Sequence, residues 1–183
     1  NIIEGYALEK MASAEVVHTM VEAKKLAFED RVNHLEDPRF GDPQIGRLIS
    51  KEHAQKRRSL ISASAAPRKH VAGAFGSDTT YLCTADREGN AVSLIQSIFA
   101  PFGSRIIAGD TGMLMNNRLC SFVLDSSKAN ALKPGKRPAH TLNSYMVFRN
   151  GEFFAVGGTP GNDDQPQSNV QILYNLLDLD IDP

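Results

Sequence analysis

Hydrophobic positions in the first sixty residues follow a helical period. Apolar side chains recur at three- and four-residue steps from 13 to 31, which predicts an amphipathic helix with Ser13 as its cap. A second, polar helix is predicted for about 50–60, where a basic cluster forms a solvated face. The two prolines that follow Asp37 and Asp42 separate these helices, because the residue before a proline disfavours the α conformation. The expected apolar face of the first helix comprises Val17, Met20, Val21, Lys24, Ala27 and Phe28.

After residue 78 the pattern changes to strands. A turn-rich link at 86–90 joins the first two predicted strands into a hairpin, and 149–151 joins the last two. A closing helix is predicted for 165–177, with Asp163 or Asp164 as its cap and Pro166 in its first turn. Helices followed by antiparallel strands predict a mixed, layered α+β architecture. The predicted strands are Thr79–Ala85, Ala91–Ile98, Met113–Met115, Leu142–Phe148 and Phe153–Val156.

Residues 62–78 separate the two halves and are almost all small, with Pro67, Gly73 and Gly76 among them. Such a stretch buries too little apolar area to offset its ordering entropy, so we expect a mobile, exposed loop. The chain therefore divides into a helical segment, 1–78, and a β-rich segment with a closing helix, 79–183.

Composition and charge add few constraints. Hydrophobic residues make up 42% and charged residues 22%, as in ordinary globular proteins, and the net charge of -1 offers no basic field for nucleic acid. No apolar run approaches the length of a membrane helix, and the first residues do not resemble a signal peptide. A soluble protein is expected, with the cytoplasm and the periplasm both open as its compartment. Cys83 and Cys120 are too few for a disulfide framework and are expected to be buried.

Several catalytic motifs are absent from the sequence: a phosphate-binding loop, H-E-x-x-H and G-x-S-x-G. The five histidines are too scattered to propose a metal site, and no organic cofactor is implied.

The junction after Asp78 carries the remaining chemistry, because Thr79 and Thr80 open a strand directly after the flexible loop. A threonine hydroxyl needs a neighbouring base, and cutting the chain before the threonine supplies one as its own α-amine. That amine titrates near neutrality, at about 7.7 to 8.0 in the reference state. By pattern alone, two threonines at a strand start equally fit ordinary β-propensity.

A resemblance favours the catalytic interpretation. The segment from Asp78 through Ser93 resembles the start of the small subunit of the gamma-glutamyltranspeptidase family. The upstream segment from Glu22 to Arg31, with Asp37-Pro38, resembles the end of that family's large subunit. The further motifs, in order, are Gln96-Ser97, Phe102-Gly103-Ser104, Gly109-Asp110-Thr111-Gly112, Asn116-Asn117, Pro134–Pro138 and Gly158-Thr159-Pro160-Gly161.

The resemblance implies an αββα sandwich of the N-terminal-nucleophile hydrolase type, incomplete in these 183 residues, which would span the junction of two subunits. It implies self-cleavage between Asp78 and Thr79, with Thr79 as nucleophile. Ser97 would assist processing and orient the threonine. Gly161 would donate its backbone N–H to an oxyanion hole, where Asn162 replaces a second glycine. The expected partners are a small amide or γ-glutamyl substrate and the remainder of both subunits.

Departures from the family concentrate in the γ-glutamyl pocket. Ser121 stands where transpeptidases carry a carboxylate for the substrate ammonium, and His140-Thr141 replace paired serines that bind a carboxylate. Phe99 replaces a polar residue that contacts the substrate amine. His140 is a candidate contact for a substrate carboxylate, with a structural role as the alternative. Arg105 adds a charge where glycine is common, either to bind an anionic substrate or to face solvent.

Two segments, His140-Thr141-Leu142-Asn143 and Asp164-Gln165-Pro166-Gln167, resemble the amidohydrolase and acylase branch of the family, which includes oxamate amidohydrolase. The sequence leaves two functions open: a self-processing threonine amidohydrolase or acyltransferase, and a non-catalytic relative that is not cut before Thr79.

Overall fold

The computed structural model describes residues 1–66, 78–179 and 181. They fall into two compact units, which are described one at a time. The first unit draws on the described residues of Asn1–Val71, Ser121–Ala139 and Val170–Pro183, and the second on those of Ala72–Cys120 and His140–Asn169. Most of the predicted loop, residues 67–77, lies outside the described residues. The mixture of helices and antiparallel strands confirms the α+β class.

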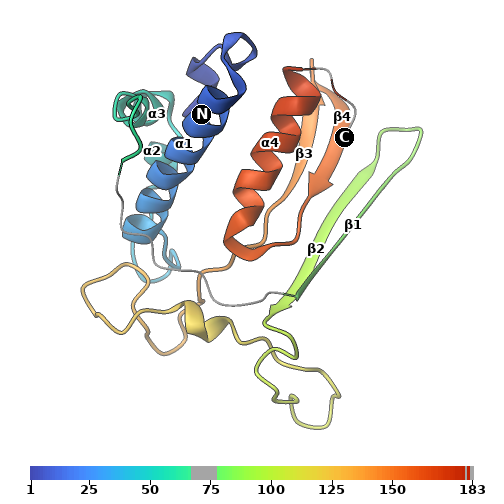
Figure 1. The fold of residues 1–183 in the computed structure, drawn as a ribbon. Coiled ribbons are helices and arrows are strands. Elements are labelled where there is room, and N and C mark those ends of the chain that lie inside the picture. The colour runs from blue at the N-terminus through green and yellow to red at the C-terminus, as the bar shows by residue number, and fades with distance from the viewer. Residues whose placement is uncertain (67–77, 180, 182–183) are drawn as a thin grey trace. The chain divides into compact units, whose positions relative to one another are not determined.

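Helices dominate the first unit (Figure 1). Two 3₁₀ turns, Ile3–Gly5 and Leu8–Lys10, precede the long helix α1, Ser13–His34, and the short helices α2, Ile45–Leu48, and α3, Lys51–Arg58, follow it. Leu8, Val16 and Met20 form its buried cluster, against which Val170 and Tyr174 from the far end of the chain pack. The hydroxyl of Tyr174 also donates to the carbonyl of Leu8 at 3.3 Å. This core therefore joins the two extremes of the sequence.

The helix α1 is confirmed, but its predicted apolar face is only partly right, because Met20 is buried whereas Val17 and Ala27 are exposed. Val17 is 56% exposed, whereas the residue before it, Val16, is buried. The face was misplaced because polar residues occupy inward positions, where ionic partners satisfy them. Glu22 is 1% exposed and accepts from Lys25 at 2.6 Å. The buried side chains of α1 are Val16, Thr19, Met20, Glu22, Ala23, Leu26 and Asp30.

The ends of the helices follow different rules. Ser13 is not the cap of α1: Ala12 occupies that position, and its N–H donates to the carboxylate of Glu15 at 3.1 Å. Ser50 does cap α3, since its hydroxyl accepts from the N–H of His53 at 3.1 Å. A carboxylate three residues into α1 therefore replaces the hydroxyl expected at its start.

The second unit contains two antiparallel hairpins (Figure 1). Strands β1, Asp78–Ala85, and β2, Ala91–Phe99, form one hairpin, and β3, Ser144–Arg149, and β4, Glu152–Gly158, form the other. Helix α4, Gln165–Leu177, begins in this unit after a 3₁₀ turn at Asn162–Asp164, and its bounds match the prediction. Four of the five predicted strands are thus present, with ends shifted by up to two residues.

The fifth predicted strand, at 113–115, does not form. The chain turns at Gly109 and Gly112, where φ is 56° and 71°, and pairing is limited to a single bridge between Ile107 and Leu114. Met113 and Met115 remain at least half exposed. Left-handed glycines bend this segment before an extended ladder can develop.

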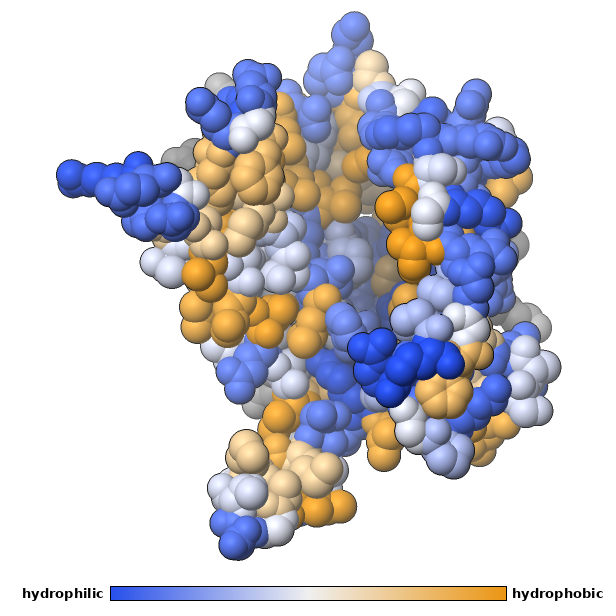
Figure 2. All heavy atoms as spheres, turned by 180° about the vertical axis from the view of Figure 1, so that it is seen from behind, coloured by the Kyte–Doolittle hydropathy of each residue, from blue (hydrophilic) through white to orange (hydrophobic). Residues whose placement is uncertain are grey.

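Side-chain hydrogen bonds connect the two hairpins. The hydroxyls of Tyr81 and Ser93 lie 3.0 Å apart, and Ser93 also donates to the carbonyl of Gly157 at 3.3 Å. Apolar side chains on the β1–β2 hairpin, among them Leu82 and Leu94, are exposed, and Figure 2 shows hydrophobic atoms along it. Strand pairing and polar contacts therefore contribute much of the order in this unit.

Candidate active site

Thr79 lies at the start of β1, half-buried, and its Cα is paired across the hairpin with that of Ser97. The register shifts between Asp78 and Thr79, because Asp78 is opposite Phe99 while Thr79 is opposite Ser97. A bulge of this kind adds an unpaired residue and disturbs the ladder locally. The peptide bond expected to be cut therefore lies opposite Ile98, the residue of β2 that has no partner in the ladder.

Ser97 organises the end of β2 as well as facing Thr79. Its hydroxyl accepts the N–H of Phe99 at 2.9 Å. Phe99 has a φ of 78°, which a bulky residue rarely adopts, and is 4% exposed. The next residue, Ala100, donates its N–H to the side-chain oxygen of Asn117 at 3.0 Å, and Asn117 donates its own N–H to the carbonyl of Ile98 at 3.3 Å. These bonds hold segment 116–118 against the end of β2.

Arg118 is a buried cation that the sequence analysis did not single out. It is 7% exposed, and its guanidinium carbon lies 5.1 Å from the centre of the Phe99 ring. Its Nη1 donates to the hydroxyl of Thr141 at 3.4 Å, whereas its Nη2 has no hydrogen-bond partner among the described residues. Burial lowers the pKa of Arg118. The only feature of the sequence that could have drawn attention to Arg118 is its position directly after the Asn116-Asn117 motif. Its burial could not be predicted, because it results from tertiary contacts.

Asn143 is the centre of a polar network that extends from Thr141 to the loop before Gly161. Its side chain donates to the carbonyl of Thr141 at 2.7 Å, and its N–H donates to the fully buried side chain of Gln165 at 3.0 Å. Its carbonyl accepts from Asn169 at 3.4 Å, and Asn169 accepts in turn from the hydroxyl of Thr159 at 2.9 Å. These hydrogen bonds therefore hold both the start of α4 and the 159–161 loop against the segment around Asn143.

Gly161 has a φ of 123°, a conformation that side chains rarely adopt, and Asn162 follows with a φ of 55°. Asparagine tolerates this left-handed region better than most residues, so the substitution for glycine is accommodated. The N–H of Asp164 donates to the carbonyl of Gly161 at 2.9 Å and closes the turn. The assignment of Gly161 and Asn162 as backbone donors remains a prediction.

The other candidate residues occupy separate places. His140 is exposed, and its Nδ1 accepts the N–H of Leu142 at 3.2 Å. Arg105 is exposed in the loop after β2 and has a φ of 61°. Ser121 belongs to the first unit, where its carbonyl accepts from the side chain of Asn130 at 2.6 Å. Contacts within the second unit thus connect Thr79, Ser97, Phe99 and, through Arg118, Thr141.

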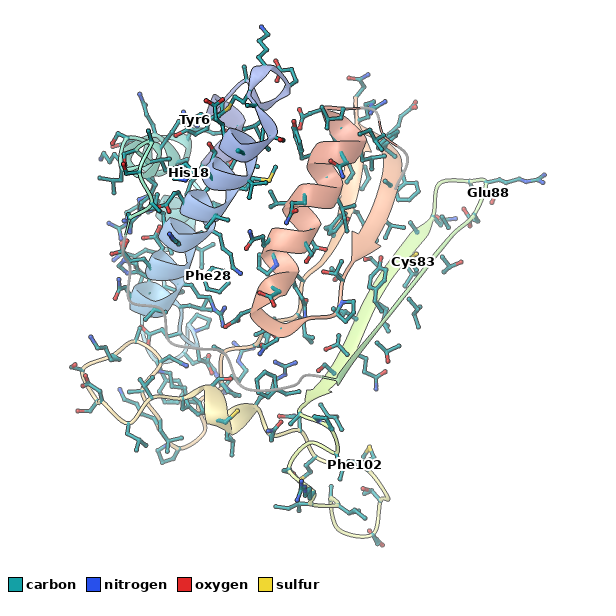
Figure 3. The ribbon with its side chains drawn as sticks, in the orientation of Figure 1. Tyr6, His18, Phe28, Cys83, Glu88 and Phe102 are labelled. Carbon is teal, nitrogen blue, oxygen red and sulfur yellow. The ribbon has the colours of Figure 1, made fainter. Side chains whose placement is uncertain are left out.

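Both cysteines are exposed, contrary to the expected burial. Cys83 lies along β1, whose hairpin turn carries Glu88 (Figure 3). In the part of the chain that the structure describes, no three His, Cys, Asp or Glu side chains are grouped so as to hold a metal ion. No helix there is long and apolar enough to span a bilayer.

Solved structures place this fold among the N-terminal-nucleophile hydrolases. A crystal structure of cephalosporin acylase from Bacillus halodurans covers the whole chain with a TM-score of 0.88 and 35% identity, and the chain covers 33% of it. Residues 1–183 match the family described as Gamma-glutamyltranspeptidase, and the chain belongs to that family.

Two curated relatives are each 40% identical to the chain. They are the glutathione hydrolase-like YwrD proenzyme of Bacillus subtilis, matched over 100% of the chain, and the oxamate amidohydrolase proenzyme of Klebsiella pneumoniae, matched over 92%. The chain spans about a third of their length, 35% and 32% respectively. Both names describe a proenzyme, one of them glutathione hydrolase-like and the other an oxamate amidohydrolase.

Proposed function

We propose that the protein carrying this chain is a self-processing threonine amidohydrolase or acyltransferase with Thr79 as its nucleophile. The pairing of a half-buried Thr79 with Ser97, next to an irregular step in the ladder, is the observation that carries the proposal. Membership of a family whose relatives are named as proenzymes supports it.

Processing would begin with attack of the Thr79 hydroxyl on the carbonyl carbon of Asp78. The C–N bond breaks as the ester forms, and the nitrogen takes a proton to become the α-amine of Thr79. Water then hydrolyses the ester and regenerates the hydroxyl. The products would be 1–78 and 79–183, the division expected from the sequence.

In turnover the freed amine would accept the hydroxyl proton as Thr79 attacks the substrate amide. The leaving amine departs with a proton, and an acyl-threonine ester remains until water or another amine resolves it. Backbone N–H groups near Gly161 and Asn162 would stabilise the oxyanion, and one such donor is worth about 3 kcal/mol in known cases.

The substrate would be a small amide that carries a carboxylate, rather than glutathione. Ser121 offers no carboxylate to a substrate ammonium, so a γ-glutamyl group gains no ionic partner there. The names of the matched oxamate amidohydrolase and cephalosporin acylase agree with this choice.

Intact mass and N-terminal sequencing of the protein expressed from its complete coding sequence test the proposal. Within these 183 residues, cleavage before Thr79 divides 20.0 kDa into parts of roughly 8.5 and 11.5 kDa, and one product begins Thr-Thr-Tyr. Thr79→Ala should abolish the cut and Thr79→Ser should retain it. The exposed neighbour provides the matched control, Thr80→Ala, which should be cut normally. An uncut wild-type protein would favour the non-catalytic alternative.

A substrate comparison tests the specificity. The processed enzyme should hydrolyse glutaryl-p-nitroanilide faster than γ-glutamyl-p-nitroanilide, which differs by its α-ammonium group. Comparable rates would contradict the role assigned to Ser121.

A further inference from the structure

Arg118 presents a charge that the described structure does not neutralise. It is 7% exposed, and none of the described ion pairs includes its guanidinium. Buried cations in folded proteins normally have an anionic partner, because removing an unpaired charge from water is costly. An unpartnered, buried guanidinium therefore points to an anion that binds there.

One nitrogen of the Arg118 guanidinium is buried without a hydrogen-bond partner in the part of the chain that the structure describes. The Phe99 ring stacks against the guanidinium at 5.1 Å, and the Thr141 hydroxyl accepts from Nη1 at 3.4 Å. Nη2 has no hydrogen-bond partner among the described residues. Because Thr141 uses its oxygen to accept, its own O–H remains able to donate to a bound anion.

Contacts within the second unit connect Arg118 to the nucleophile strand. Phe99, on which Arg118 stacks, donates its N–H to Ser97, and Ser97 is paired with Thr79. The preceding residue, Asn117, forms hydrogen bonds with both Ile98 and Ala100. These bonds hold the backbone next to Arg118 against the end of β2. A group bound to Arg118 would thus be held by the elements that position Thr79.

We propose that Arg118, with the Thr141 hydroxyl, binds the carboxylate of the substrate's acyl part. The planar fork of an arginine matches a carboxylate, and the apolar Phe99 ring beside it reduces screening by water. The inference deepens the proposed function and rests on it. It assigns recognition of the substrate carboxylate to Arg118, whereas the sequence analysis had proposed His140 and Arg105 for this role.

Kinetics on one pair of substrates tests the role of Arg118. The pair is glutaryl-p-nitroanilide and its methyl ester, which lacks the charge. Arg118→Met should lower kcat/KM for the acid about 100-fold and for the ester less than about threefold, as expected for loss of a charge-assisted hydrogen bond. Arg118→Lys, which keeps the charge without the fork, should fall in between.

The matched control is Arg149→Met. Arg149 also stacks on a phenyl ring, with its guanidinium carbon 3.9 Å from the centre of the Phe154 ring, but it is exposed. The same substitution there should leave both rates unchanged. An equal fall in the acid and ester rates for Arg118→Met would assign Arg118 a structural role and overturn the inference.

Binding without turnover separates this inference from the proposed function. Titration calorimetry on the wild-type protein should show glutarate binding at least about tenfold more tightly than its uncharged analogue glutaramide. Equal affinities would overturn the role of Arg118 even if every arginine variant failed to fold. A missing cut before Thr79, by contrast, would overturn the proposed function and leave the affinity comparison valid.

Discussion

The carboxylate of Asp37 accepts hydrogen bonds from both the backbone N–H and the guanidinium of Arg137, a residue 100 positions further along the chain. Arg39 binds the same carboxylate at 2.7 Å and also donates to the carbonyl of Gly135 at 2.8 Å. The side chain of Asp37 has no exposed surface, whereas both arginine side chains are more than half exposed. One buried carboxylate thus fastens the segment after α1 to the Pro134–Pro138 motif.

Asp37→Asn should lower the midpoint of thermal unfolding by several degrees, because the amide cannot satisfy two guanidinium groups. Hydrogen bonds from Arg39, and then from Arg137, hold the pKa of Asp37 far below its ordinary value. A depressed pKa stabilises the fold above the unfolded-state value, so the difference between wild type and variant should persist down to about pH 4 and shrink below it. Asp178→Asn, at an exposed position, is the control and should match wild type throughout.

The two products of processing should stay together under native conditions. Within the first unit, contacts that join residues before and after Thr79 include Asp37 with Arg137, Glu36 with Lys136, and Leu8 with Tyr174. Size-exclusion chromatography should therefore elute both pieces in one peak, and guanidinium chloride should separate them. Separate elution in native buffer would show that these contacts do not hold the pieces.

Asp30→Asn should cost about 3 kcal/mol of unfolding free energy, the scale of breaking a buried ion pair. Asp30 is 7% exposed, and its carboxylate bonds to the guanidinium of Arg57 and to His53 at 2.8 Å. Burial alone would raise the pKa of Asp30, but these two partners offset it and lower the pKa.

Urea denaturation measures this cost, and an exposed pair provides its control. Glu52 lies one turn before Lys56 on α3. Its Oε1 is 2.6 Å from the Nζ of Lys56, and both side chains are largely in solvent. Glu52→Gln should leave stability unchanged within error, since exposed pairs contribute little. Equal losses of unfolding free energy in Asp30→Asn and Glu52→Gln would show that burial does not strengthen the Asp30 ion pair.

Ser97→Ala should slow processing before Thr79 by about tenfold, because the variant removes the acceptor for the Phe99 N–H as well as the hydroxyl opposite Thr79. Mass spectrometry of the unprocessed fraction over time gives the rate. Ser97→Thr retains a hydroxyl and should largely restore processing, which a purely packing role would not require. Ser127→Ala removes a hydroxyl in an exposed turn and should have no effect. Unchanged processing in Ser97→Ala would contradict this role.

Gly158→Ala should destabilise the protein by about 1 to 3 kcal/mol, the usual cost of overpacking. A methyl group at Gly158 would lie 2.6 Å from the ring of Tyr81, closer than real contacts allow. Gly46 in α2 has no atom within 4 Å of that position, so Gly46→Ala should be neutral or slightly stabilising. Thermal unfolding of the two variants compares them, and equal stability would show that Tyr81 moves aside freely.

Local chemistry explains why much of the fold could be predicted. The first hairpin is correct because alternating residues flank a turn in which Asp86 accepts from the N–H groups of Glu88 and Asn90, and Gly89 takes a φ of 83°. Helix α4 is correct because Pro166 fits its first turn. The predicted face of α1 was only partly right, because buried carboxylates such as Glu22 have ionic partners that the periodicity of apolar residues does not reveal.

Within the candidate site, only residues that belong to recognisable sequence motifs could be predicted. Thr79 and Ser97 were selected by resemblance, and strand register places them opposite each other. Arg118 was missed because its importance arises from burial against Phe99, which depends on how segments distant in sequence meet. The roles of Gly161 and Asn162 remain predictions from the resemblance.

The irregular step between Asp78 and Thr79 also determines how little of the hairpin a cut would disturb. Of the eight Cα pairs between β1 and β2, seven lie on the Thr79 side of the break, and only the pair of Asp78 with Phe99 lies on the other. A new chain end made there would remain anchored by an intact ladder. Maturation would then require little refolding, because the β1–β2 ladder that would hold the new α-amine is already paired before the cut.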